Sequence, residues 1–208
     1  MLVLNFGWVT MDYSNCIIIA VEGIDGAGKS TLIAELTKQL MNDVSIYERT
    51  KKGKITQKLV TSKILQKYKF IQIPVYLLLS YKNFCLFKVK EKKAPIVIMD
   101  RCFLSNICYF FPKALYDQKL LKRVLYWEVK LIPKKIFILD VDPRIGMIRD
   151  NKKKSLDWLT SSREAYLNSS NSLINEYVNI EILKQEFSTK QKVKVIMEYI
   201  QGEKDYGN

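Results

Sequence analysis

Short, almost wholly apolar runs recur along the chain, separated by longer segments of mixed polarity. Five runs rich in β-branched residues predict strands that are buried on both faces. They span residues 17–21, 44–47, 96–99, 136–139 and 180–183. Helical segments are predicted between them at 31–40, 56–92 and 115–131, the last stopped by Pro133. This alternation predicts an α/β fold, in which a five-stranded parallel sheet carries helices on both faces.

A glycine-rich segment connects the first predicted strand to the first predicted helix. Residues 23–30 read Gly-Ile-Asp-Gly-Ala-Gly-Lys-Ser and match the phosphate-binding loop pattern. Backbone N–H groups of such a loop point inward and suit phosphate oxygens, and the following helix adds its positive N-terminal end. Lys29 would reach the β- and γ-phosphates, and the Ser30 hydroxyl would bind Mg²⁺. The predicted ATP-binding residues are Gly23, Gly26, Ala27, Gly28, Lys29, Ser30 and Thr31.

Acidic and basic residues follow the later strands directly. Asp100 and Arg101 come after the strand at 96–99. Ligands bind at the carboxyl ends of parallel strands, so we expect Asp100 to hold Mg²⁺ or its water beside Ser30, with Arg101 in the same crevice. In a purely structural alternative, Asp100 caps the next helix and Arg101 forms an ion pair with a neighbouring carboxylate. For Asp142 we favour capping, because Pro143 suits the first turn of a helix.

Composition indicates one compact domain and restricts the classes of binding partner that we expect. The chain has 208 residues, 48% of them hydrophobic, which we assign to a domain at 16–203 behind an N-terminal extension at 1–15. Its net charge of +13 would attract polyanions, but the basic runs are dispersed and no aromatic-interleaved basic stripe occurs, so nucleic acid is not the expected partner. The apolar residues 1–9 are too short to span a membrane, and no membrane partner is expected.

Cysteine usage indicates a reducing compartment. The four cysteines, at 16, 85, 102 and 108, show no metal-ligand spacing. Cys16 and Cys108 lie in apolar stretches, which favours reduced core thiols over disulfides. We therefore expect a cytoplasmic protein.

Three segments resemble the thymidylate kinase family. Residues 21–31, with Glu22 and Asp25, resemble that family's phosphate loop. Residues 100–109 are similar to its Asp-Arg-Tyr-x-x-Ser-x-x-Ala-Tyr segment, and 137–143 to its later strand. The resemblance covers about residues 16–200. It implies a nucleoside monophosphate kinase with five parallel strands and a short lid at about 149–162, which forms a homodimer and moves the γ-phosphoryl group of MgATP onto dTMP.

The resemblance also implies roles for single residues. Asp25 would approach the acceptor sugar and phosphate, Arg101 would bind the acceptor phosphate, and Tyr166 would face the acceptor pocket. The remaining acceptor-binding positions are Glu48, Ser105 and Tyr109, with Leu78, Lys82 and Phe110 at the positions that contact the base. Those last three depart from the phenylalanine, arginine and glutamine common in the family. Adenine is expected near 184–188.

The catalytic cation is expected from the lid. Ala27 stands where some family members carry an arginine in the loop. The loose phosphoryl transition state needs positive charge around its equatorial oxygens. Arg149, with the lysines at 152–154, lies in the expected lid, and Arg163 is a further candidate. Lys29, Asp25, Arg101 and Arg149 are therefore the predicted catalytic residues.

Two alternatives stay open at this point. The departures at the base-contacting positions would also suit a kinase of the same fold that uses another nucleotide or a nucleoside. The net charge would suit a non-catalytic protein whose nucleic-acid binding is gated by a nucleotide.

Overall fold

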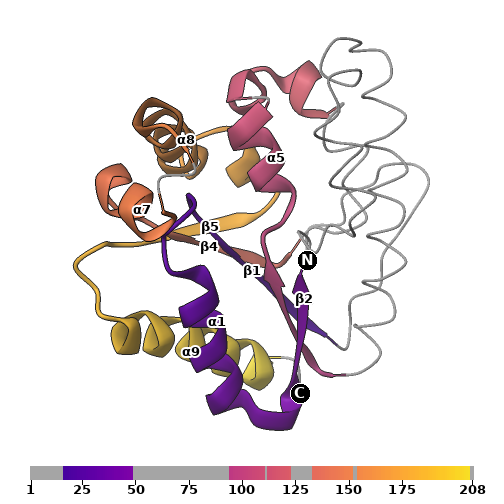
Figure 1. The fold of residues 1–208 in the computed structure, drawn as a ribbon. Coiled ribbons are helices and arrows are strands. Elements are labelled where there is room, and N and C mark those ends of the chain that lie inside the picture. The colour runs from indigo at the N-terminus through magenta and orange to yellow at the C-terminus, as the bar shows by residue number, and fades with distance from the viewer. Residues whose placement is uncertain (1–15, 49–93, 111, 123–132, 152–153, 207–208) are drawn as a thin grey trace, which may run out of the picture.

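A five-stranded sheet forms the centre of the molecule. The computed structural model describes residues 16–48, 94–110, 112–122, 133–151 and 154–206. The strands β1 (Ile17–Glu22), β2 (Val44–Glu48), β3 (Ile96–Asp100), β4 (Lys135–Leu139) and β5 (Asn179–Leu183) run parallel in the order β2-β3-β1-β4-β5 (Figure 1). The predicted fold class is confirmed, and each of the five predicted strands lies within one of these.

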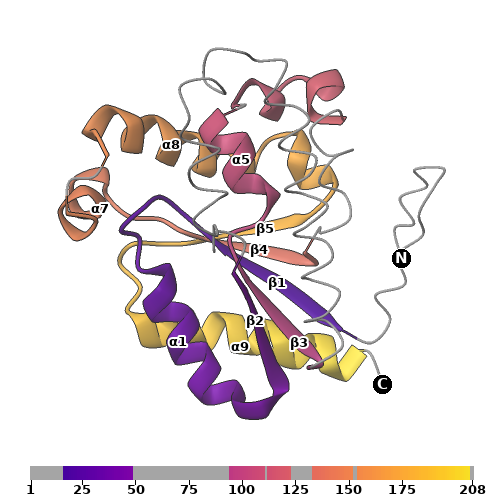
Figure 2. The ribbon, with the colours of Figure 1, turned by 45° about the vertical axis from the view of Figure 1, so that its right-hand side comes forward.

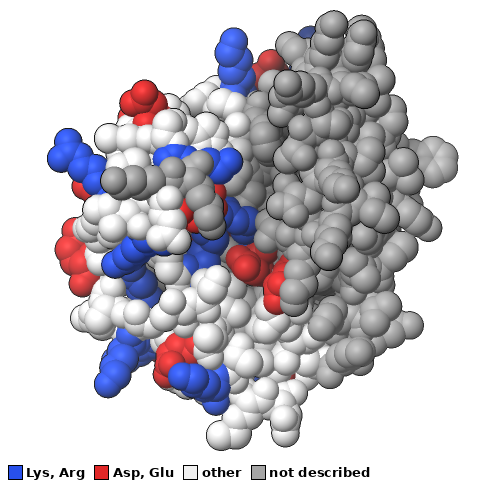
Figure 3. Space-filling model, viewed as in Figure 1, with Lys and Arg blue, Asp and Glu red and all other residues white. Residues whose placement is uncertain are grey.

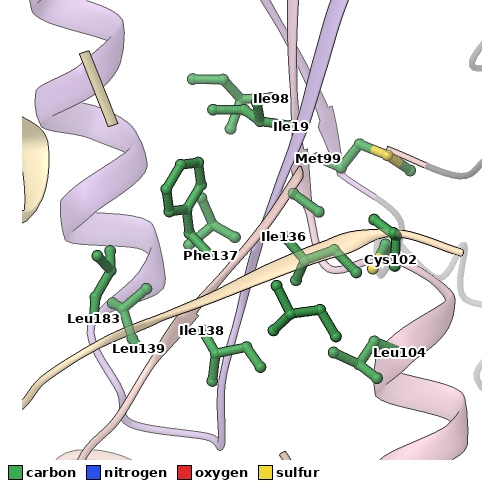
Figure 4. Close-up of a cluster of buried hydrophobic side chains, with 14 of the residues drawn as sticks. Ile19, Ile98, Met99, Cys102, Leu104, Ile136, Phe137, Ile138, Leu139 and Leu183 are labelled. Carbon is green, nitrogen blue, oxygen red and sulfur yellow. The ribbon is translucent and has the colours of Figure 1, made fainter. Parts of the chain in front are cut away.

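The central strand is buried along its whole length. All six residues of β1 are buried, because β3 and β4 pair with its two sides and helices cover both faces. Ile19 pairs with Ile98, and side chains of β3 and β4 join them in the core, where Phe137 and Met99 are fully buried (Figure 4). A strand buried on both faces needs apolar side chains throughout, which explains the unbroken apolar runs of the sequence.

Helices lie on both faces of the sheet. One face carries α1 (Lys29–Leu40) and α9 (Thr189–Tyr206), which pack against each other. The other face carries α5 (Phe103–Phe110) and α8 (Leu156–Ser169), and α8 also contacts α7 (Pro143–Arg149) (Figure 2). The 3₁₀ helices are η1 (Met41–Asp43), η2 (Pro112–Leu115) and η4 (Leu173–Glu176).

Two local predictions around the lid have different outcomes. The Asp142 side chain accepts a hydrogen bond from the Arg144 amide at 2.7 Å and caps α7, so the capping role is confirmed. The polar segment after Lys154, expected to belong to a lid connection reaching 162, is helical from Leu156. Ser155 caps this helix, and Ser162 faces inward and is buried. A polar segment can thus be helical when its small side chains face inward, and the lid at about 149–162 stays a prediction.

Other predictions lie partly or wholly beyond the described residues. The helix expected at 115–131 is described only to 122, as η2 followed by helical residues 118–122. The extension at 1–15 and the helical region at 56–92 lie outside the described residues. Cys16, Cys102 and Cys108 are buried thiols that form no disulfide among the described residues, as predicted, whereas Cys85 falls outside these residues. Within the described segments, no helix combines the length and apolarity needed to cross a bilayer.

Candidate functional site

The loop between β1 and α1 has the backbone of a phosphate cradle. Gly26 and Gly28 adopt φ angles of 78° and 89°, values that side chains with a Cβ rarely tolerate. A Cβ on Gly28 would meet nothing within 4 Å, so this stretch borders open space at the N-terminus of α1. Free helix N-terminal amides and open space together provide an anion site. Ser30 and Thr31 are exposed in the first turn beside it, and Ala27 is buried beneath.

The phosphate loop packs directly against the backbone of α7. A Cβ built on Gly26 would lie 2.1 Å from the Gly146 carbonyl oxygen, and one on Gly146 would lie 2.8 Å from the Asp25 carbonyl oxygen. Two backbones therefore touch directly, with no side chain between them. Gly146 is not among the site residues predicted from the sequence. The sequence held one signal for this contact. A glycine inside a short helix lowers helix stability by about 1 kcal/mol relative to alanine, so its presence indicates a close approach of another group.

Lys29 is buried under the loop. Its Nζ donates hydrogen bonds to the carbonyl oxygens of Gly23 at 3.0 Å and Ile24 at 2.8 Å. Burial, and secondly the positive charge of Arg101, lower the pKa of Lys29 from 10.5 to about 8. Two neutral carbonyl acceptors thus hold the buried ammonium against the loop, and an anionic phosphate would be a stronger acceptor.

Asp100 lies at the carboxyl end of β3, beside β1 and β2. Its backbone pairs with Val21 on one side and Glu48 on the other. The Oδ1 atom is buried and has no hydrogen-bond partner among the described residues. Burial raises the pKa of this carboxyl group, against the lowering effect of Lys29 and Arg101. A buried carboxylate oxygen without a donor suits a hard cation or its water.

Arg101 is the cation at the centre of the site. Its guanidinium is almost buried, and its Nη1 donates to the Gly23 carbonyl at 3.1 Å and to the Tyr109 hydroxyl at 2.8 Å. The Nη2 atom forms an ion pair with the Asp25 carboxylate of the phosphate loop. The backbone of Arg101 has a φ of 70°, a strained value for a residue with a side chain, of the kind found at functional sites.

Glu22 organises the wall behind Arg101, a role that sequence analysis did not identify. Its fully buried carboxylate accepts hydrogen bonds from the Cys102 and Ser105 amides at 2.7 and 3.2 Å, and so caps the N-terminus of α5. The second oxygen accepts from the Ser105 hydroxyl at 2.7 Å and the Tyr166 hydroxyl at 3.0 Å. The sequence does carry a signal for this role, because Glu22 ends an apolar strand. A charge at the end of a buried strand requires hydrogen-bond or ion-pair partners.

This wall changes two of the predicted acceptor contacts. Ser105 is buried, with its hydroxyl bonded to Glu22 and 3.0 Å from the Tyr166 hydroxyl. Tyr166 is only 1% exposed, so the expectation that it faces the acceptor pocket is wrong. Both residues instead belong to the internal hydrogen-bond network, because their hydroxyls donate to the buried carboxylate of Glu22.

Tyr109 and Trp158 form an aromatic pair at the outer side of Arg101. Their ring centroids lie 4.7 Å apart with planes inclined by 30°. The Lys154 ammonium lies 4.7 Å from the centroid of the Trp158 ring. Tyr109 therefore comes together with Arg101 as predicted, whereas Trp158 was not singled out from the sequence.

The candidate lid cations have separate positions. Arg163 donates from Nε and Nη2 to the two oxygens of Asp140, at 2.6 and 2.9 Å, so its charge is engaged in a bidentate pair. Arg149 is exposed at the end of α7. Burial lowers the pKa of Lys192 in α9, the charge of Asp140 opposes this effect, and the charge of Arg149 adds to it. Residues 152–153 lie outside the described segments.

The remaining acceptor positions are described only in part. Glu48 is exposed at the end of β2, and its charge acts on Asp100. Leu78 and Lys82 lie outside the described residues, and of Phe110 only the backbone, at the end of α5, is described. Figure 3 shows both basic and acidic side chains on the described part of this face.

Comparison with known proteins gives consistent matches. The family model described as thymidylate kinase matches residues 21–200. A probable thymidylate kinase of Archaeoglobus fulgidus is 30% identical over 167 residues, covering 72% of this chain and 80% of that protein. A thymidylate kinase of Leptospira interrogans is 33% identical over 166 residues, covering 72% and 79%. The crystal structure of thymidylate kinase from Ehrlichia chaffeensis superposes with a TM-score of 0.64 at 17% identity, covering 89% of this chain and 99% of that one.

Proposed function

The chain belongs to the thymidylate kinase family, and we propose from this that it transfers the γ-phosphoryl group of MgATP to a nucleoside monophosphate, with dTMP as the acceptor. The observation that carries the proposal is the contact of Arg101 with the phosphate loop. The Arg101 guanidinium bonds to Gly23 and pairs with Asp25, so a cation suited to one phosphate stands directly beside a cradle suited to others. Transfer between two phosphates requires that adjacency.

ATP would bind with its phosphates in the glycine loop. The α1 amides supply donors, and the Lys29 ammonium exchanges the Gly23 and Ile24 carbonyls for phosphate oxygens. This exchange replaces neutral acceptors with charged ones, which form stronger hydrogen bonds with an ammonium. The expected effect on transfer is stabilisation of the charge that develops on the γ-phosphate.

Mg²⁺ fits the residues at this edge of the sheet. We propose that the Ser30 hydroxyl and the unpartnered Asp100 carboxylate oxygen would hold it, directly or through water. When bound, the ion would neutralise part of the negative charge of the β- and γ-phosphates. Its binding would also give Asp100 the positive partner that the oxygen lacks.

The acceptor phosphate would bind Arg101, with Tyr109 and Glu48 nearby. This phosphate must compete with Asp25 for the guanidinium, which frees Asp25 to contact the acceptor sugar. No general base is needed, because a phosphate monoester with a second pKa of about 6 is already ionised at neutral pH. The absence of histidine from the chain therefore presents no difficulty.

Arg149 is the proposed lid cation. Arg163 is neutralised by Asp140, while Arg149 is exposed on the helix that touches the phosphate loop through Gly146. This placement favours Arg149 for charge stabilisation at the transferred phosphoryl group. We further propose that the protein acts in the cytoplasm as a homodimer. The buried, reduced thiols of Cys16, Cys102 and Cys108 fit a reducing compartment.

The experiment that tests this function measures ADP release from MgATP in the presence of each member of a panel of nucleoside monophosphates and nucleosides. A reaction without the acceptor is the control for each. Preferred turnover of dTMP is the expected result. Preferred use of another acceptor would point to the altered base-contacting positions Leu78, Lys82 and Phe110. ATP binding without acceptor-dependent turnover would contradict a kinase.

A further inference from the structure

Helix α8 contacts the Arg101 network through two aromatic side chains. Trp158 and Tyr166 are eight residues apart, so they lie about two turns apart on one face of the helix. Tyr166 is fully buried, and its hydroxyl bonds to Glu22 at 3.0 Å and accepts from Arg101 at 3.4 Å. This residue fixes the far end of α8 to the wall of the site.

Trp158 contacts the same network through Tyr109. The Tyr109 ring stacks on Trp158 at 4.7 Å and meets Tyr166 edge-on at 5.8 Å, so α8 confines it on two sides. The Tyr109 hydroxyl accepts the 2.8 Å hydrogen bond from Arg101. Two rotatable bonds separate this hydroxyl from the backbone, and the contacts with α8 restrict both.

The position of Trp158 differs from that of a core aromatic residue. It lies in the first turn of α8, where its amide donates to the capping Ser155 hydroxyl at 3.3 Å, and it is only half-buried. The ammonium of Lys154 lies over its ring, 4.7 Å from the centroid. Two stacked rings, Trp158 and Tyr109, therefore lie between two cations, Lys154 and Arg101, and the Arg101 guanidinium carbon lies 5.4 Å from the Tyr109 centroid.

We propose that Trp158 is a positioning residue for the acceptor: it holds Tyr109, and through the Tyr109 hydroxyl it orients the Arg101 guanidinium that receives the acceptor phosphate. The inference rests on the proposed function. An aromatic pair contributes about 0.5–1.5 kcal/mol beyond its buried area, which is enough to favour one orientation of Tyr109 by up to about tenfold. Loss of Trp158 should therefore weaken use of the acceptor and leave use of ATP unchanged.

The test compares Trp158→Leu, Trp158→Phe and the wild type for the KM of dTMP, the KM of ATP and the Tm. We expect Trp158→Leu to raise the KM of dTMP about fivefold to tenfold and to leave the KM of ATP within about twofold of the wild type. Trp158→Phe should keep the KM of dTMP near the wild-type value, because phenylalanine keeps a ring on Tyr109. Leu167→Ala, a half-buried change on the same helix, is the control for lost packing and should shift only the Tm. If Trp158→Leu folds poorly, Trp158→Met, whose unbranched and flexible side chain adapts better to the space left by the ring, takes its place.

A double-mutant cycle with Tyr109→Phe distinguishes positioning from general packing. If Trp158 acts through the Tyr109 hydroxyl, adding Trp158→Leu to Tyr109→Phe raises the KM of dTMP little further. Additive effects, an unchanged KM of dTMP, or an equal rise in both KM values would overturn the inference. Absence of acceptor-dependent turnover in the wild type would instead refute the proposed function, so the two failures are distinguishable.

Discussion

Arg101 and Asp25 form an ion pair across the crevice between β3 and the phosphate loop. The side chain of Arg101 is 10% exposed and that of Asp25 28%, so the pair closes the space between the two proposed phosphate sites. Removing the partner of a buried charge is costly, and the acceptor phosphate is the one group in the scheme that can replace Asp25 without loss of charge pairing. The pair therefore keeps Arg101 in place before the acceptor binds.

Substitution of Arg101 by lysine should damage acceptor use selectively. A lysine ammonium cannot pair with Asp25 and reach the Tyr109 hydroxyl and the Gly23 carbonyl at once, as the planar guanidinium does. We expect the KM of dTMP to rise about tenfold or more, with little change in the KM of ATP. Arg163→Lys, which changes a pair that ties α8 to Asp140, is the matched control. Equal effects of the two variants on the KM of dTMP would contradict the assignment of Arg101.

Lys29→Met should remove activity without loss of fold. At pH 7 the folded protein carries the Lys29 ammonium although burial has lowered its pKa to about 8, so burying its charge opposes folding there. We expect kcat to fall about a thousandfold or more. The Tm without nucleotide should be unchanged or higher. A large fall in Tm would show that Lys29 serves the fold rather than the phosphates.

ATP affinity should depend on pH through Lys29. With a pKa of about 8 in the free protein, Lys29 is protonated below pH 8, and bound phosphate favours its charged form. Above pH 8 binding must take up a proton, so affinity falls as pH rises, by up to about tenfold per pH unit. Isothermal titration calorimetry in two buffers of different ionisation enthalpy measures that uptake. If the ATP affinity of the Lys29→Met variant fell with pH in the same way, the pH dependence would belong to another group.

Glu22→Gln should destabilise the protein more than the loss of an exposed charge. Glu22 accepts from two backbone amides and two hydroxyls at the start of α5, and an amide side chain can satisfy only part of this set. We expect a loss of about 1–3 kcal/mol in the free energy of unfolding, measured by urea denaturation. Glu203→Gln removes the surface pair with Lys134 and should cost at most about 1 kcal/mol. Equal costs would exclude the organising role of Glu22.

Gly146→Ala should weaken ATP binding through the phosphate loop. The new Cβ would lie 2.8 Å from the Asp25 carbonyl oxygen, so α7 or the loop must move. We expect a destabilisation of about 1–3 kcal/mol and a higher KM of ATP. Gly202→Ala on α9, where a Cβ meets nothing within 4 Å, should instead stabilise by up to about 1 kcal/mol. An unchanged KM of ATP in Gly146→Ala would show that this contact does not set the loop.

The sequence predicted best those features whose signals are local. The strands each depend on a few consecutive residues, and the structure confirms them. The loop at 23–30 is equally local, and its glycines adopt the positive φ angles that such a turn needs. Glu22 was not identified as an organiser because its partners Cys102 and Ser105 are about 80 residues away in the chain. Tyr166 was misassigned for the same reason, since its hydroxyl bonds to Glu22 across 144 residues. The Trp158–Tyr109 stack likewise depends on how α8 packs against α5 and could not follow from periodicity.

The measurement that tests the central claim most directly is ³¹P NMR of MgATP and dTMP incubated with the protein. We predict that resonances of ADP and dTDP appear together and in equal amounts, because the γ-phosphoryl group passes from one nucleotide to the other without release. Unchanged ATP, or ADP formed together with inorganic phosphate and no dTDP, would contradict phosphoryl transfer to this acceptor.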